Sequence, residues 1–147
     1  MKARNNRSGF TLLEIIIVII IVGVLASLAL PRLFSTVEFS RSTAALTALG
    51  LVRASIERCS AVDNSIADCV DIDELDVEDP GETTGSNFSY AITDDGPDPE
   101  DRNYTITATR LANDGGNAGD TIYLEVVNTG ATTGITRGGT GAFVNIH

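Results

Sequence analysis

The stretch FTLLEIIIVIIIVGVLASLAL, from Phe10 to Leu30, is dominated by apolar residues and carries a single charge, at Glu14. A helix rises about 1.5 Å per residue, so this stretch is about 30 Å long, the thickness of a bilayer's hydrocarbon core. The nine residues before it include Lys2, Arg4 and Arg7, which the positive-inside rule places on the cytoplasmic side. The sequence therefore predicts one membrane span with a cytoplasmic N-terminus and an exported remainder.

Helical periodicity continues after the apolar run. Pro31 cannot donate a backbone hydrogen bond, so it is expected to kink or loosen the preceding turn. Beyond it, apolar side chains recur near one helix face and charged side chains lie elsewhere. We expect one long helix, with a membrane half at 10–31 and an amphipathic half at 32–58, ending near Arg58.

The last third of the chain changes to a period of two, which is typical of strands. We expect an acidic loop with at most a short helical turn over 59–87, followed by an antiparallel sheet within 88–147. The expected strands are 88–93, 103–110, 121–127 and a weaker one at 142–146, which follows a Gly-rich segment where no strand is predicted. The predicted fold class is α+β, a long N-terminal helix whose amphipathic half packs on a small antiparallel β-sheet head.

The region after the helix is strongly acidic. The formal net charge of the chain is −10, and no Lys or Arg occurs between Cys59 and Asp101. Such a surface repels nucleic acid and anionic lipid headgroups, so no nucleic-acid partner is expected. Two acidic clusters could offer oxygens to calcium, but neither has EF-hand spacing, and we interpret both as solvated loops without a metal or cofactor. These clusters are Asp71, Asp73, Asp76 and Asp79, and then Asp94, Asp95, Asp98 and Asp101.

The chain has two cysteines, Cys59 and Cys69, in a polar segment. Because the segment is expected to be exported, one disulfide is favoured over two buried thiols.

Catalysis is not indicated. The one histidine is the terminal His147, and the sequence contains no phosphate-binding glycine loop, nucleophile elbow or metal-spaced Cys/His cluster. We therefore predict a protein that is not an enzyme.

The segment Gly9-Phe10-Thr11-Leu12-Leu13-Glu14, between a short basic leader and a long apolar helix, resembles the type III signal of type IV pilins and type II secretion pseudopilins. Pro31 also falls where that family has a helix-loosening proline. The resemblance covers roughly the first 50 residues. It implies that a prepilin peptidase removes the leader, residues 1–9, by cutting between Gly9 and Phe10, and then methylates the new amine of Phe10. A glycine there lets a protease approach the bond closely.

The resemblance also implies a role for Glu14 in assembly, where its carboxylate pairs with the N-terminal amine of a neighbouring subunit. An acid within a membrane span costs a few kcal/mol, which by itself marks a functional candidate. In the alternative, Thr11 and Glu14 form a helix capping box. We favour assembly because a cap leaves the Gly9–Phe10 junction unexplained, although both roles are compatible at different moments.

The family further implies local melting of the helix between Gly23 and Pro31 in a filament. Its implied partners are other copies of the chain or other pilins, the peptidase, membrane lipid before assembly and an inner-membrane assembly platform. The implied location is the bacterial inner membrane, as a single-pass protein, and then a periplasmic or cell-surface filament. Residues 104–110 and 121–130 also resemble central strands of pilin heads. The Cys59–Cys69 loop departs from the family, whose disulfides usually lie in the C-terminal part of the head.

Two other interpretations remain open. An ordinary signal peptide, with Ser27 and Ala29 before the cut, would release a soluble acidic binding domain that begins at Leu30. A simple membrane anchor would retain Met1. The first residue of the mature chain distinguishes these two from the pilin interpretation, which predicts Phe10. Within the family, the residues do not separate a pilus subunit from a pseudopilus subunit.

Overall fold

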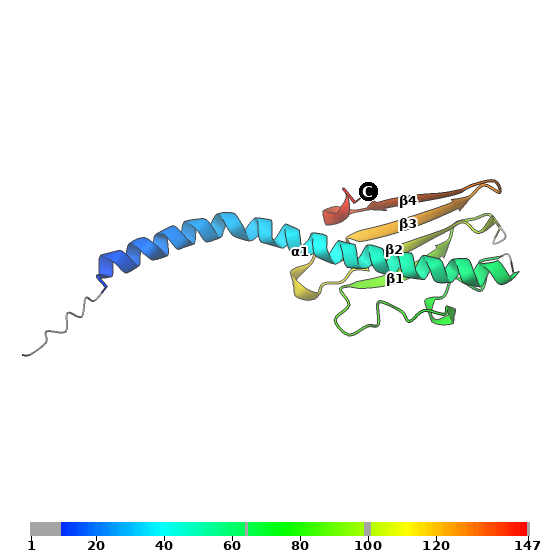
Figure 1. Ribbon diagram of the computed structural model, residues 1–147, viewed down its shortest axis with the longest axis horizontal. Helices are drawn as coiled ribbons and strands as arrows, with labels where there is room; N and C mark the ends of the chain where they lie inside the picture. Colours follow the sequence, from blue (N-terminus) through cyan, green and yellow to red (C-terminus); the bar gives the residue numbers. More distant parts are fainter. Residues whose placement is uncertain (1–9, 64, 99–100, 147) are drawn as a thin grey trace, which may run out of the picture. The chain divides into compact units, whose positions relative to one another are not determined.

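A computed structural model describes residues 10–63, 65–98 and 101–146. One long helix, α1 (Leu12–Asp63), precedes four strands, β1 (Phe88–Asp94), β2 (Tyr104–Arg110), β3 (Thr121–Asn128) and β4 (Thr133–Gly139) (Figure 1). The chain divides into two compact units, Met1–Val37 and Glu38–His147, and α1 contributes to both. We call residues 10–37 the N-terminal helix segment and Glu38–His147 the head. The α+β fold class is confirmed.

The helix α1 begins with a side-chain cap and continues through its proline. The hydroxyl of Thr11 accepts a hydrogen bond from the backbone N–H of Glu14 at 3.3 Å, as expected of an N-cap residue. Pro31 lies inside α1, and its ring nitrogen leaves the Ser27 carbonyl without the usual backbone donor. Local propensity over 52 residues therefore outweighs one missing hydrogen bond.

The predicted end of α1 near Arg58 is wrong, because the helix continues to Asp63. The additional turn contains Ser60, which is buried, and Cys59, which is bonded to Cys69 in the following loop. The polar sequence of this turn suggested a loop, but tertiary contacts keep it helical. Within that loop, the short helical turn expected between residues 59 and 87 is the 3₁₀ turn η1 (Ile72–Glu74), capped by the Asp71 carboxylate.

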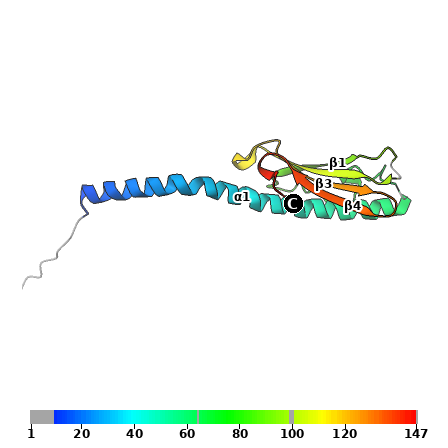
Figure 2. The ribbon, with the colours of Figure 1, turned by 90° about the horizontal axis from the view of Figure 1, so that it is seen from above.

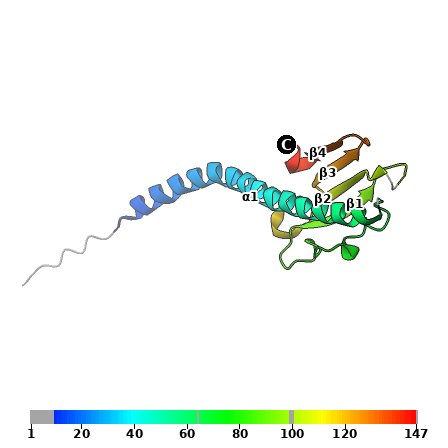
Figure 3. The same cartoon turned by 45° about the vertical axis from the view of Figure 1, so that its right-hand side comes forward.

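The four strands form an antiparallel meander in the order β1-β2-β3-β4 (Figure 3). The first three strands agree with the sequence prediction to within one residue at each end. The fourth does not. β4 lies in the Gly-rich segment where no strand was predicted. The predicted strand at 142–146 is not formed, and the 3₁₀ turn η4 (Gly141–Phe143) occupies its beginning.

Close contacts explain both errors at the C-terminal end. A Cβ on Gly138 would overlap the Tyr123 ring, so a residue without a side chain is needed for β4 to pair there. After β4, Gly141 adopts a φ of +58°, and the Asp120 carboxylate accepts a hydrogen bond from the next backbone N–H at 3.0 Å. The chain therefore turns, and Phe143 is buried with its ring centroid 5.7 Å from that of Phe88.

The core lies between the head part of α1 and one face of the sheet (Figure 2). Four α1 residues at helical spacing are fully or almost fully buried, and alternate residues of β2 and β3 meet them. Burial of a large aliphatic side chain contributes about 1.5–3 kcal/mol, so these contacts dominate the stability of the head. The residues are Ala45, Leu49, Val52 and Ile56 from the helix and Ile106, Ala108, Ile122, Leu124 and Val126 from the strands.

Candidate functional site: the N-terminal helix segment

Every residue of the N-terminal helix segment is exposed. Its large apolar side chains have exposed fractions from 38% at Val37 to 78% at Leu12. Soluble monomers rarely expose contiguous apolar patches larger than a few hundred Å², and α1 is long and apolar enough to cross a membrane. This surface therefore requires a cover of lipid or of other apolar helices.

Glu14 is the one charged residue between Phe10 and Leu30, and it lies in the first turn of α1. Its backbone N–H is bonded to Thr11, but its carboxylate makes no hydrogen bond or ion pair within the part of the chain that the structure describes. One of the two hydrogen bonds of the predicted capping box is thus present. It is the bond from the Glu14 backbone to the Thr11 side chain, and the Glu14 side chain takes no part in it. Phe10 is 77% exposed, whereas Gly9 and the leader lie outside the described residues.

Gly23 and Pro31 both lie within continuous helix. A Cβ built on Gly23 meets nothing within 4 Å, so packing inside this chain does not require a glycine there. Glycine lowers helix stability by about 1 kcal/mol relative to alanine. Near Pro31, the Ser27 hydroxyl donates to the Val24 carbonyl at 2.8 Å. Melting of this stretch in a filament stays a prediction.

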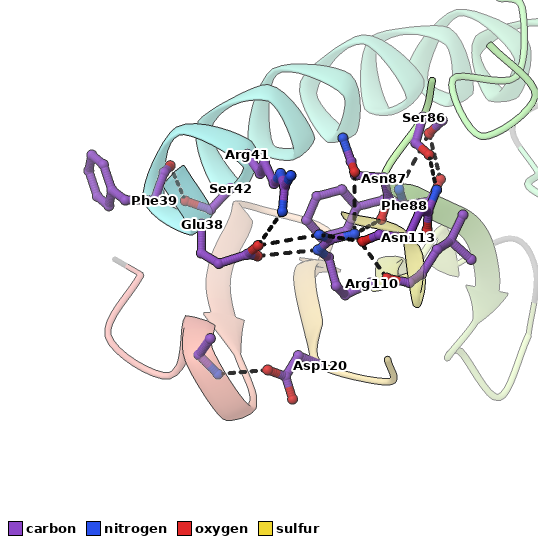
Figure 4. Close-up of polar contacts among 12 residues, drawn as sticks. Glu38, Phe39, Arg41, Ser42, Ser86, Asn87, Phe88, Arg110, Asn113 and Asp120 are labelled. Atoms are coloured by element: carbon purple, nitrogen blue, oxygen red, sulfur yellow. Dashed lines mark hydrogen bonds and ion pairs between the residues drawn. The ribbon is translucent and has the colours of Figure 1, made fainter. Parts of the chain in front are cut away.

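The head contains a buried charge cluster that the sequence analysis missed (Figure 4). The Arg110 side chain is fully buried at the end of β2. Its guanidinium donates to the Glu38 carboxylate of α1 at 3.2 and 3.3 Å and lies over the Phe88 ring, 5.7 Å from the centroid. It also donates to three backbone carbonyls, those of Asn87 at 3.1 Å, Leu111 at 2.9 Å and Asn113 at 3.2 Å.

This arrangement connects the helix to the sheet by a charge and not only by apolar packing. The hydrogen bond from Arg110 lowers the pKa of Glu38. Desolvation opposes this shift, and the Arg41 guanidinium, 2.5 Å from the Glu38 carboxylate, adds to it. Gly116 also lacks a side chain for a local reason, because a Cβ there would overlap the Arg110 guanidinium. A sequence signal was present, since Arg110 follows Tyr104, Ile106 and Ala108 in the inward phase of β2.

Several acidic residues of the head serve as backbone caps or ion-pair partners. Asp76 accepts two hydrogen bonds from Arg58, both at 2.8 Å, and a short one from Ser55. Arg58 and then Ser55 lower the pKa of the Asp76 carboxyl. Asp79 and Asp94 accept backbone N–H groups two residues further on, at 2.7 and 3.0 Å. Within the described ranges, no three His, Cys, Asp or Glu residues are grouped to bind a metal ion.

The predicted disulfide is present. Cys59 and Cys69 are bonded, with their Cα atoms 6.0 Å apart, a usual separation for such a bridge. Because Cys59 lies in the last turns of α1, the bond connects the end of the helix to the acidic loop. Together with the Arg58–Asp76 pair, it attaches this loop to the head at two places.

Comparison with known proteins identifies the N-terminal segment. Residues 4–30 match a family model described as the prokaryotic N-terminal methylation motif. In this segment the chain carries the motif of type IV pilins and type II secretion pseudopilins. This pilin-like chain is 55% identical over 38 residues to type II secretion system core protein G of Escherichia coli (strain K12), which covers 26% of each chain.

A second relative is a type IV major fimbrial protein, FimA of Dichelobacter nodosus. It is 33% identical over 66 residues, or 45% of this pilin-like chain and 42% of FimA. The core protein G of Pseudomonas aeruginosa is 35% identical over 54 residues, or 37% and 38% of the two chains. The alignments thus span less than half the length of these curated relatives. No solved structure matches the chain.

Proposed function

We propose that the chain is a structural subunit of a type IV pilus or a type II secretion pseudopilus. It is stored in the bacterial inner membrane, N-terminus in the cytoplasm, and then polymerises through its N-terminal helix into a periplasmic or cell-surface filament. The observation that carries this proposal is the exposed apolar helix segment, whose one carboxylate, near its start, has no partner among the described residues. A pilus-type and a secretion-type relative both match the chain, so the proposal includes both machines.

Processing is the first step of the proposal. A prepilin peptidase cuts between Gly9 and Phe10 and methylates the new amine, which leaves a positive charge four residues before Glu14. The methylation motif over residues 4–30 supports this step. Before assembly, membrane lipid covers the apolar side chains of the helix, and an inner-membrane platform then transfers the subunit into the filament.

Glu14 sets the register of assembly in this proposal. In a filament, bundled apolar helices exclude water, and an unpaired carboxylate there is destabilising by several kcal/mol. Pairing with the Phe10 amine of an adjacent copy removes this cost at one axial offset of the two helices. The carboxylate is available for that role because it has no partner among the described residues of its own chain. Apolar packing along the helix supplies most of the remaining association energy.

The proposal includes no enzymatic activity and no cofactor. Four of the eight acidic residues that were candidates for a calcium site already have partners, because Asp71, Asp79 and Asp94 cap backbone groups and Asp76 pairs with Arg58. The head then serves as the surface of the filament, and the helix as its core.

The mass and the first residue of the membrane-extracted chain test the proposal. We expect a chain of residues 10–147 with one methyl group on the Phe10 amine. Replacement of Gly9 by phenylalanine should leave full-length precursor, because a bulky side chain obstructs the scissile bond, whereas Asn6→Ala in the leader should be processed normally. A mature chain that begins at Leu30 would indicate an ordinary signal peptide, and retained Met1 a simple anchor. Either result refutes the proposal.

A further inference from the structure

Phe39 is the one aromatic residue of the head whose side chain is exposed within the part of the chain that the structure describes. Its exposed fraction is 70%, and Figure 4 shows its ring pointing away from the cluster of Glu38 and Arg110. Along α1, Phe39 follows directly on the exposed apolar residues of the N-terminal helix segment, which include Phe34 and Val37. This continuity along one helix indicates that Phe39, like them, needs a cover from outside the chain.

A pocket of about 300 Å³ lies between α1 and the loop that precedes β1. Alanines of α1, among them Ala44 and Ala48, line one side of it, and Thr83, Thr84 and Ser86 belong to the loop. A cavity of about 150 Å³ is large enough for a benzene ring. The pocket therefore has room for one aromatic side chain.

The charges around the pocket favour an aromatic occupant over a free anion. Arg41 is the one charged residue among the described residues that line it, although the net charge of the chain is −10. An apolar ring therefore buries no carboxylate here, and a guanidinium is attracted to the face of an aromatic ring. Arg41 already pairs with Glu38 at 2.5 Å, so its charge is partly neutralised before any ligand binds.

Phe39 and the pocket are on opposite sides of α1. Phe39 and Ala48 are nine residues apart, which is about two and a half helical turns. One copy therefore cannot place its own Phe39 in its own pocket. A protrusion and a hollow on opposite sides of one chain give a heterologous contact, which repeats from copy to copy and generates an open filament.

The register proposed for Glu14 brings the two features to the same level. If the Phe10 amine of one copy pairs with Glu14 of the next, the two copies are displaced by four residues, about 6 Å along the helix. For parallel helices with this displacement, Phe39 of the first copy is level with residue 43 of its neighbour. The α1 residues that line the pocket lie between positions 41 and 48, on both sides of that level. The N-terminus and the head thus indicate the same offset independently.

We propose that, in a filament, Phe39 of one copy inserts into the pocket between α1 and the loop before β1 of a neighbouring copy. The inference rests on the proposed function, since it specifies a contact between assembled subunits. Ala44 and Ala48 keep the pocket open for this contact, because a larger side chain at either position would occupy it. An aromatic side chain that fills a pocket of its partner is typical of the residues that dominate the binding energy of an interface.

Crosslinking within filaments tests the inference. Full-length chains with Phe39→Cys and chains with Thr84→Cys are co-expressed with the wild type, whose contacts support assembly, and the isolated filaments are mildly oxidised. Mass spectrometry should identify a disulfide between positions 39 and 84 of different chains, and none between two Phe39→Cys chains. The native cysteines are already bonded to each other, so they do not compete. Thr47→Cys in place of Phe39→Cys is the control, because Thr47 is exposed on α1 but about 12 Å further along.

Filament yield gives a second, independent measurement. Phe39→Ala, and Ala48→Leu, which fills the pocket with a good helix former, should each lower the filament-borne fraction about tenfold or more, whereas Phe39→Leu should lower it less. Ala61→Leu, at an exposed position outside the pocket, is the matched control. The thermal melt of the unassembled chain in detergent should be unchanged by Phe39→Ala, because this side chain is exposed before assembly.

The inference is overturned if filaments form without the crosslink between positions 39 and 84, or if Ala48→Leu assembles as well as Ala61→Leu. Loss of filaments with Phe39→Ala but not with Ala48→Leu would place Phe39 against another surface, which also overturns it. Absence of filaments from the wild-type chain would overturn the proposed function itself. The failure of this inference, with filaments present, is therefore distinguishable from the failure of the proposed function.

Discussion

The N-terminal helix segment and the head use apolar residues in opposite ways. In the segment, Ile15 to Ile21 are all exposed, whereas in the head Leu49, Val52 and Ile56 are almost completely buried. Both sets belong to the same helix, so helix propensity does not distinguish them. The difference is periodicity, because the first set is apolar on every side and the second on one side only. A helix that is apolar on every side can bury its surface only against lipid or against helices of other chains.

Charges show the same contrast. The carboxylate of Glu14 has no partner among the described residues, whereas Glu38 pairs with Arg110 and Arg41, and Asp76 pairs with Arg58. The head satisfies its polar groups internally, and no buried side-chain nitrogen or oxygen of the described residues lacks a hydrogen bond. Substitutions in the segment should therefore affect assembly, and those in the head should affect folding.

The largest effect is expected at Glu14. Glu14→Ala should preserve or improve membrane insertion and reduce filament-borne subunit by an order of magnitude or more, because a pair that sets register is lost. Glu14→Gln should behave similarly, since it keeps the shape and loses the charge. The measurement compares membrane and filament fractions, with processing verified by mass. Glu78→Gln, on the exposed acidic loop, is the control. Wild-type filament yield from both Glu14 variants would show that Glu14 is only part of a helix cap.

The second effect concerns the stability of the head. Arg110→Met removes the guanidinium from a fully buried position and leaves the Glu38 carboxylate and three carbonyls without it. We expect a loss of about 3 kcal/mol in the free energy of unfolding, from denaturant titration of the full chain in detergent. Arg137→Met, on exposed β4, should change it by less than about 0.5 kcal/mol. Equal effects of the two substitutions would contradict the assigned role of Arg110.

A further test of the head adds Glu38→Gln to Arg110→Met. If the two side chains interact as the 3.2 Å contact indicates, the double variant should be more stable than the sum of the single losses predicts. Strict additivity would mean that Arg110 acts mainly through its carbonyl partners and Phe88.

The disulfide should have a somewhat smaller effect. Cys59→Ser with Cys69→Ser should lower the free energy of unfolding by about 2–3 kcal/mol, because the bridge closes a short loop of the unfolded chain. Thiol labelling of the denatured, non-reduced protein should find no free thiol in the wild type. Filament yield at low temperature should be nearly unchanged, since the N-terminal helix segment is not altered. A large loss of filaments with little loss of stability would assign the loop to contacts between copies.

The smallest effect is a pH dependence in the head. Arg110 lowers the folded-state pKa of Glu38 below its unfolded value, so the unfolded chain binds more protons in this range. The stability that Glu38 contributes is therefore complete above the unfolded pKa and is lost as pH falls through the lower, folded pKa. Melting temperatures measured below about pH 4.5 should fall less steeply for Glu38→Gln than for the wild type or for Glu78→Gln. Parallel curves for all three would contradict this.

Much of the fold was predictable because its signals are local. The period of two over 88–93 and 103–110 identified strands to within a residue, and helical spacing identified the buried face of α1. β4 was missed because a glycine-rich edge strand has no strand propensity. The reason for its glycines is tertiary, because Tyr123 and Phe143 approach the β4 backbone closely. Residues 142–146 look like a strand by composition, but Gly141 and Asp120 turn the chain before it can pair.

The sequence by itself determined the N-terminal helix segment, the single carboxylate within it and the motif around the Gly9–Phe10 junction, because these features depend on neighbours along one chain. The disulfide was also predictable, since two cysteines allow one pairing. Only the tertiary structure decided that Arg110 is buried against Glu38, that α1 continues to Asp63 and that Tyr123 lies on Gly138. Each of these depends on atoms brought together from distant parts of the chain, where packing and desolvation outweigh local preference.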